Sequence, residues 1–197
     1  MEAVVKKYQQ KFRKVKEEMH RWEELQSRLI SQFSNASSIV QRLQVIGDKK
    51  YYGSLRGVDG VEEAVLRKQL DSLETILLSI NKILEDFRGI VLLLEKMVRD
   101  GRQLVKGRSQ LSTGQLKQRV GVKPSLSDCL DGLSILHEMH SSEYILKTSV
   151  VCALSKLTLK MSATDLGALH QLLIDQPNIP RDEVQFIFDI IFSEEIC

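Results

Sequence analysis

The chain has 197 residues, of which 43% are hydrophobic and 27% charged, and its formal net charge is +2. These proportions are ordinary for a globular protein and exclude a wholly disordered or fibrous chain. Only three prolines and 6% aromatic residues are present, a composition that favours helices over a β-sandwich or barrel. The length predicts one folded unit.

The charge is distributed unevenly along the chain. Residues 1–124 hold 24 Lys and Arg against 15 Asp and Glu, whereas residues 125–197 hold 4 against 11. A basic first part and an acidic last part are typical of a protein with two surfaces for different partners, although the two parts could equally attract each other within one fold.

The sequence predicts neither a membrane span nor a signal peptide. The richest apolar run, from Ile90 to Leu94, is far shorter than the roughly 18 residues that a transmembrane helix needs. The first residues lack the apolar core of a signal peptide. The three cysteines fit neither a disulfide framework nor a metal knuckle, so we expect a reducing compartment, with Cys129 and Cys152 as buried apolar side chains.

Two long helices are expected in the first half of the chain. From Val5 to Leu43, apolar residues recur at alternating steps of three and four, and Gln26 is the only polar member of the series. That pattern over about six heptads predicts a coiled-coil-like helix. A second and broader series, which suits burial against more than one helix, contains the following residues: Leu66, Leu70, Leu73, Leu77, Ile80, Leu84, Phe87, Val91, Leu94, Val98, Gly101 and Val105.

The predicted fold class is therefore all-α. A long antiparallel hairpin over residues 1–106, with a loop at about residues 47–60, packs with a C-terminal group of shorter helices. Residues 107–123 are rich in Gly, Ser and basic residues and are interpreted as a flexible basic linker. In the C-terminal segment, residues 124–197, Ser125 and Asp128 have the spacing of a helix capping box. The last helix is expected to bury the following residues: Val184, Phe186, Ile187, Ile190 and Ile191.

No motif indicates catalysis, and the sequence predicts no catalytic residue, no cofactor and no small-molecule substrate. His137 and His140 share a helical face, but no third metal ligand stands out beside them, so no metal is predicted. The glycines of the 47–60 loop are not followed by the Gly-Lys-Ser/Thr of a phosphate-binding loop.

Basic residues are concentrated at the start of the first helix and again between residues 99 and 123. Their density is sufficient for contacts with RNA phosphates or with an acidic partner, although basic residues on a solvated helix face and in a soluble linker would look the same. The second group consists of Arg99, Arg102, Lys106, Arg108, Lys117, Arg119 and Lys123.

Several stretches resemble the AIRIM family of ribosome maturation factors, which act with Afg-type AAA ATPases. The clearest are Leu66-Arg67-Lys68-Gln69-Leu70 at the start of the second helix and residues 122–130 at the start of the third. Ser34-Asn35 and the acidic end at residues 182–195 also fit, in the same order and at similar spacing.

The resemblance implies a non-catalytic adaptor in large-subunit ribosome maturation. Its implied partners are an Afg-type AAA ATPase, a second small helical subunit and the pre-ribosomal particle, from which shuttling factors are released. Arg67, Lys68 and Gln69 would mark a partner-binding surface, and Ser125 and Asp128 a structural helix cap. The implied location is the nucleus and cytoplasm, and also the nucleolus. One departure concerns the third helix, where a strongly basic family pattern is reduced here to Lys147.

Two other functions are compatible with the residues alone. The chain could be a coiled-coil scaffold subunit of an unrelated assembly, or a helical protein that binds pre-ribosomal RNA directly through its basic residues. The second alternative predicts an affinity for RNA that falls steeply with salt.

Overall fold

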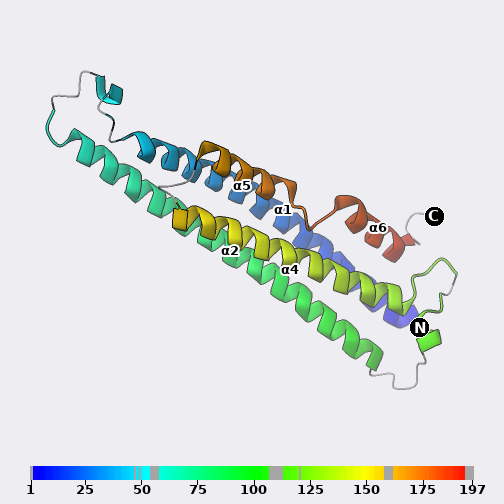
Figure 1. The fold of residues 1–197 in the computed structure, drawn as a ribbon. Coiled ribbons are helices and arrows are strands. Elements are labelled where there is room, and N and C mark those ends of the chain that lie inside the picture. The colour runs from blue at the N-terminus through cyan, green and yellow to red at the C-terminus, as the bar shows by residue number, and fades with distance from the viewer. Residues whose placement is uncertain are drawn as a thin grey trace. The chain divides into compact units, whose positions relative to one another are not determined.

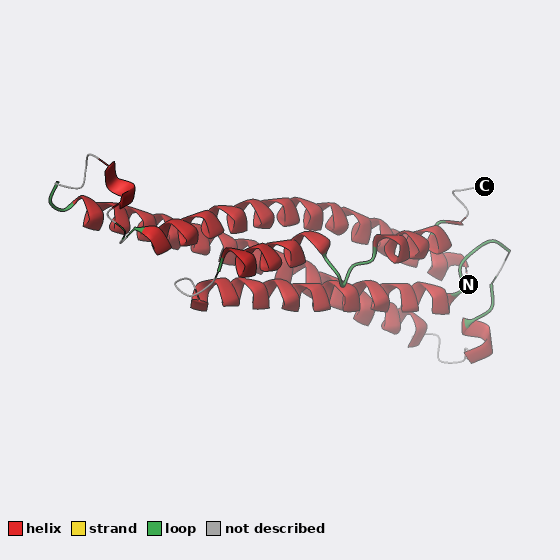
Figure 2. Ribbon diagram, turned by 45° about the horizontal axis from the view of Figure 1, so that its top comes forward, coloured by secondary structure: helices red, strands yellow, loops and turns green. Residues whose placement is uncertain are grey.

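A computed structural model describes residues 2–46, 48, 50–53, 58–106, 113–119, 121–157 and 162–193. Within these residues the secondary structure is helical, with no strand, and this confirms the predicted all-α class (Figure 2). The described residues form six helices (Figure 1): α1 (Glu2–Val45), α2 (Val61–Lys106), α3 (Thr113–Leu116), α4 (Leu126–Leu157), α5 (Ala163–Asp175) and α6 (Arg181–Ile191).

The two long helices α1 and α2 confirm the predicted hairpin. Gly60 precedes α2 with a φ of +79°, a left-handed conformation that glycine adopts without steric cost. Glu62 and Glu63 follow in the first turn, where negative charge complements the helix dipole. Of the predicted 47–60 loop, residues 47, 49 and 54–57 lie outside the described residues. Residues 50–53 form a short 3₁₀ turn.

The predicted linker over residues 107–123 is described only in part, because residues 107–112 and 120 lie outside the described residues. The described part contains the short helix α3. It also contains two basic residues in ion pairs, Arg119 with Asp128 at 3.0 Å and Lys123 with Glu2 at 2.8 Å.

The chain divides into two compact units, each built from parts of both the hairpin and the C-terminal segment. Unit 1 comprises Met1–Glu24, Phe87–Ile145 and Gln176–Cys197. Unit 2 comprises Leu25–Asp86 and Leu146–Asp175. Helices α1, α2 and α4 each contribute residues to both units.

In unit 1, α1 and α2 run antiparallel. Tyr8 donates a hydrogen bond from its hydroxyl to the Gly101 carbonyl at 2.8 Å, and the Trp22 and Phe87 rings meet at 4.4 Å. Between these two contacts the α1 residue number rises by as much as the α2 number falls, which is the register of an antiparallel pair. Burial raises the pKa of the Tyr8 phenol, so the hydroxyl remains a hydrogen-bond donor.

Glycine allows α4 and α6 to approach α1 closely in unit 1. A Cβ atom on Gly132 of α4 would lie 3.0 Å from Ile187 and 3.2 Å from the Phe12 ring. The same Phe12 ring meets Phe188 of α6 edge-on, with centroids 6.0 Å apart. Four helices therefore converge around the first turns of α1, as in a four-helix bundle.

The last helix differs from the sequence prediction at one position. Ile187 and Ile191 of α6 are buried as expected, and Val184 and Ile190 are half-buried. Phe186, in contrast, is 63% exposed. It precedes Ile187 by one residue and therefore projects about 100° away around the helix from the buried face.

In unit 2, the single polar residue of the α1 series has a structural role. Gln26 is 4% exposed and accepts a 2.7 Å hydrogen bond from the ammonium group of the fully buried Lys147 of α4. The Gln26 amide donates in turn to the backbone carbonyl of Leu173 in α5. One glutamine thus joins three helices, and a buried charge receives one of the acceptors that it needs.

The Gln26 contacts predict a marked loss of stability when this side chain becomes apolar. Gln26→Leu removes the acceptor for Lys147 and the donor to Leu173, and we expect it to lower the free energy of unfolding by about 2–4 kcal/mol. Urea denaturation followed by circular dichroism measures this change. Leu29→Met, one turn along the same face, is the control and should cost less than about 1.5 kcal/mol. Equal stability of Gln26→Leu and wild type would contradict the assigned role.

The close approach at Gly132 predicts that added side-chain volume is not tolerated. Gly132→Val drives methyl groups towards Phe12 and Ile187, and we expect it to lower the free energy of unfolding by about 1–3 kcal/mol. The control is Gly167→Val in α5, because a Cβ atom at Gly167 meets nothing within 4 Å. If the two variants had the same thermal midpoint, the proposed packing at Gly132 would be wrong.

Candidate functional site

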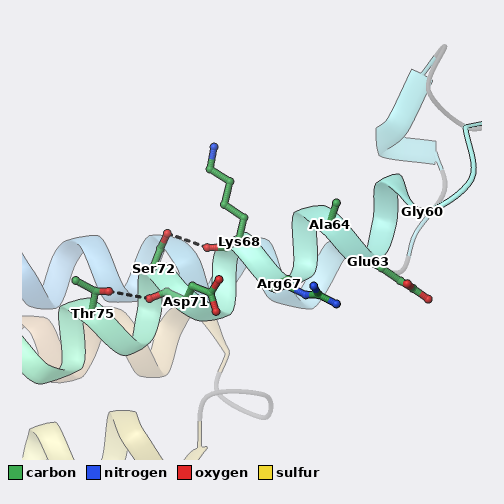
Figure 3. Close-up of a pocket in the computed structure, with 8 residues that line it drawn as sticks. All are labelled: Gly60, Glu63, Ala64, Arg67, Lys68, Asp71, Ser72 and Thr75. Carbon is green, nitrogen blue, oxygen red and sulfur yellow. Dashed lines mark hydrogen bonds between the residues drawn. The ribbon is translucent and has the colours of Figure 1, made fainter.

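Arg67 and Lys68 lie on the surface of α2 in unit 2, near its start. Both side chains are exposed and line a furrow of about 560 Å³ (Figure 3). Because every lining residue belongs to one stretch of chain, this is a furrow between side chains of one helix and not an enclosed cavity. The lining consists of Gly60, Glu63, Ala64, Arg67, Lys68, Asp71, Ser72 and Thr75.

The furrow presents charged groups and no free hydroxyl. Ser72 donates to the Lys68 carbonyl at 2.8 Å, and Thr75 donates to the Asp71 carbonyl at 2.9 Å, so both hydroxyls bond to their own helix (Figure 3). Two cations and two carboxylates leave the furrow close to neutral. Such a surface is suited to directional contacts with a protein and offers no activated nucleophile.

Gln69 lies on a different face of α2 from Arg67 and Lys68. It is half-buried, and its Oε1 atom has no hydrogen-bond partner among the described residues. Arg67 and Lys68 therefore form a surface together, whereas Gln69 faces the interior side of α2.

Leu66 and Leu70 depart from the expected buried series. Leu73 and Ile80, further along the series, are 6% and 0% exposed, but Leu66 is 38% and Leu70 is 47% exposed. The reason is the length of the neighbouring helices. In unit 2 the start of α2 extends past the described ends of α4 and α5, beyond their cover (Figures 1 and 2). The apolar periodicity identified these leucines as members of the series but did not predict their exposure.

The residues of the second basic group differ in their exposure and in their ion pairs. Arg99, Arg102 and Lys106 are exposed in the last turns of α2, and Arg99 pairs with Glu95 at 3.3 Å. Lys117 is exposed after α3. Arg119 and Lys123 form the ion pairs with Asp128 and Glu2 described above, which occupy their charge within unit 1. Arg108 lies outside the described residues.

Ser125 and Asp128 form a reciprocal cap at the start of α4. The Asp128 carboxylate accepts from the Ser125 N–H at 3.0 Å, and the Ser125 hydroxyl accepts from the Asp128 N–H at 3.1 Å. Desolvation alone would raise the pKa of Asp128. The hydrogen bonds from Ser125 and the charge of Arg119 outweigh it, and the pKa lies below its usual value.

The histidine and cysteine positions show no metal site in the part of the chain that is described, where no group of three His, Cys, Asp or Glu could hold an ion. His140 is buried, its ring meets Trp22 at 4.7 Å, and its Nδ1 lies 2.7 Å from the Leu136 carbonyl oxygen. Cys129 is buried as expected, which raises the pKa of its thiol to about 12. The expected burial of Cys152 is wrong, because this residue lies on the solvent face of α4.

Sequence reasoning missed how the basic start of α1 meets α2. Lys7, Lys11 and Lys14 line a groove in unit 1 together with Lys96 of α2. Arg13, on another face of α1, lies over the Phe192 ring at 5.8 Å. The spacing of the lysines was a visible signal, but their α2 neighbours depend on the register of the hairpin, which the sequence alone did not provide.

The whole sequence was compared with protein families and with curated proteins. A family model described as "CA109-like: Ribosome biogenesis protein C1orf109-like" matches residues 2–196. A search of curated proteins found no match. Within the described residues, no helix is both long enough and apolar enough to cross a membrane.

The lowered pKa of Asp128 predicts an acid-sensitive contribution to stability. A carboxyl group whose folded pKa lies below its unfolded value of about 3.9 stabilises the fold above that value. The contribution is lost as the pH falls through the folded pKa. Asp128→Asn should therefore cost about 1 kcal/mol near neutral pH and progressively less in acid. Urea denaturation at several pH values measures the difference. Glu138→Gln, at an exposed site of α4, is the control, and a pH-independent difference for Asp128→Asn would contradict the assignment.

Proposed function

The chain belongs to the C1orf109-like family of ribosome biogenesis proteins, and we propose that it is a non-catalytic adaptor in the maturation of the large ribosomal subunit. AIRIM and C1orf109 denote the same family, so the proposal extends the resemblance found in the sequence. In this role the chain links an Afg-type AAA ATPase to pre-ribosomal particles, from which shuttling factors are released. It acts with a second small helical subunit, in the nucleus, the nucleolus and the cytoplasm.

The observation that carries the proposal is the exposed apolar surface at the start of α2. Leu66 and Leu70 share a face with residues that form the core further along the helix, yet solvent reaches both of them. Arg67 flanks them, about 60° around the helix from Leu70, whereas Lys68 lies on the opposite side of α2. Apolar side chains next to a cation, on a helix that extends beyond its neighbours, are typical of a surface completed by a partner helix.

We assign this surface, Leu66 and Leu70 with the flanking Arg67, to the second small helical subunit. A partner helix laid along α2 would continue the arrangement in which shorter helices cover the long ones. Burial of two leucines would contribute roughly 3 kcal/mol, which corresponds to about a hundredfold in affinity. The Arg67 cation would add orientation more than affinity.

The proposed surface predicts a separation between folding and function. In cells depleted of the chain, Leu66→Asp/Leu70→Asp should fail to restore the release of shuttling factors from large-subunit particles, because the partner binds about a hundredfold more weakly. Particles separated on a sucrose gradient and analysed by mass spectrometry provide the readout. Circular dichroism of the purified variant checks that its helices remain.

The matched control is Leu78→Asp. Leu78 is 64% exposed on the same helix but lies about 120° around it from Leu66. We expect this variant to restore release as wild type does. If the Leu66→Asp/Leu70→Asp variant fully restored the release of shuttling factors, this surface would not be the partner site. Normal release of shuttling factors in cells depleted of the chain would contradict the proposed function itself.

A further inference from the structure

A second surface lies in unit 1, where the first half of α1 and the last half of α2 leave a groove of about 480 Å³ between them. Three lysines of α1, Lys7, Lys11 and Lys14, line one side, and Lys96 of α2 lines the other. Spaced by four and three residues, the α1 lysines form one stripe about 10 Å long. None of these positions belongs to the surface assigned above.

The charge of the groove is positive and only partly neutralised. Lys11 pairs with Asp100 at 3.4 Å, and the exposed fractions of these side chains are 21% and 43%. In the part of the chain that is described, Lys7, Lys14 and Lys96 have no carboxylate within ion-pair distance. Three cations around one concavity repel each other, and a negatively charged occupant would relieve that repulsion.

The groove also has an apolar floor. Leu93, Leu104 and the buried Met97 line it. Leu93 is 36% exposed. Leucines in a concavity bordered by lysines form a mixed surface, which matches a ligand that is itself both apolar and acidic.

We propose that this groove binds an acidic amphipathic helix of a partner protein. Leucine-like side chains of that helix would pack on Leu93 and Leu104, and its carboxylates would pair with Lys7, Lys14 and Lys96. RNA fits less well, because phosphates gain nothing from a leucine floor and no lining residue is aromatic and able to stack on a base. The inference does not depend on the ribosomal role, since it concerns different residues and a different ligand chemistry.

The test uses the full chain and a designed probe. The probe is a fluorescent helical peptide with leucines one turn apart and glutamates flanking them, titrated by fluorescence anisotropy. We expect saturable binding that weakens with salt. Lys7→Glu/Lys14→Glu should weaken it by roughly a hundredfold, and Leu93→Asp by about tenfold or more. Lys6→Glu/Lys16→Glu is the matched control, because it changes the net charge equally on the same helix, outside the groove, and should leave most of the affinity.

Four results would overturn the proposal. An equal loss of affinity in both lysine double variants would indicate general charge attraction. Equal binding of a peptide with serines in place of leucines would show that the apolar floor does not contribute. Displacement of the peptide by polyuridine RNA, with the same dependence on Lys7 and Lys14, would assign the groove to nucleic acid. A smaller sedimenting species on Lys7→Glu/Lys14→Glu substitution would assign it to a second copy of the chain.

Discussion

The apolar stripe of α1 is the constraint on which the rest of the structure depends. A helix of 44 residues with such a stripe along its length is stable in water only if other helices cover the stripe. In unit 1, helices α2, α4 and α6 do so around Tyr8, Phe12 and Trp22. In unit 2, α4 and α5 meet α1 at Gln26 and Phe33, where the Phe33 ring stacks on His170 at 5.9 Å. The polar exceptions are satisfied: the Tyr8 hydroxyl bonds to Gly101, the Trp22 indole to Gln176 at 2.8 Å, and Gln26 to Lys147 and Leu173.

The two proposed surfaces lie where helices stop covering one another. At the start of α2, helices α4 and α5 no longer cover Leu66 and Leu70, so part of a core-type face meets solvent next to Arg67. In unit 1 the groove is lined by long, charged side chains of α1 and α2 that lie outside the core. Both surfaces are better suited to a protein segment than to a small molecule, since neither encloses a ligand or positions a nucleophile. That agrees with membership of a ribosome biogenesis family and with an adaptor role.

Helix positions followed from the sequence because periodicity and capping are local. The alternating series from Val5 to Leu43 predicted α1, and the Ser125–Asp128 spacing marked the start of α4. The exposure of individual residues did not follow. Leu66, Leu70 and Phe186 belong to apolar patterns, and Cys152 is an apolar residue type, but burial depends on which helix lies opposite and where that helix ends. The groove was missed for the same reason, because Lys7 and Lys96 are brought together only by the hairpin register. The role of Gln26 could not be read from its position, since its partners are more than a hundred residues away in sequence.

In the proposed role, this chain joins an AAA ATPase to ribosome maturation without catalysis of its own. The most direct test is affinity purification of the tagged full chain from nuclease-treated extract, with the captured proteins identified by mass spectrometry. The adaptor role predicts recovery of an Afg-type AAA ATPase together with a second small helical protein, at levels unaffected by nuclease. Recovery of a coherent complex without either protein, or loss of all partners after nuclease treatment, would contradict it.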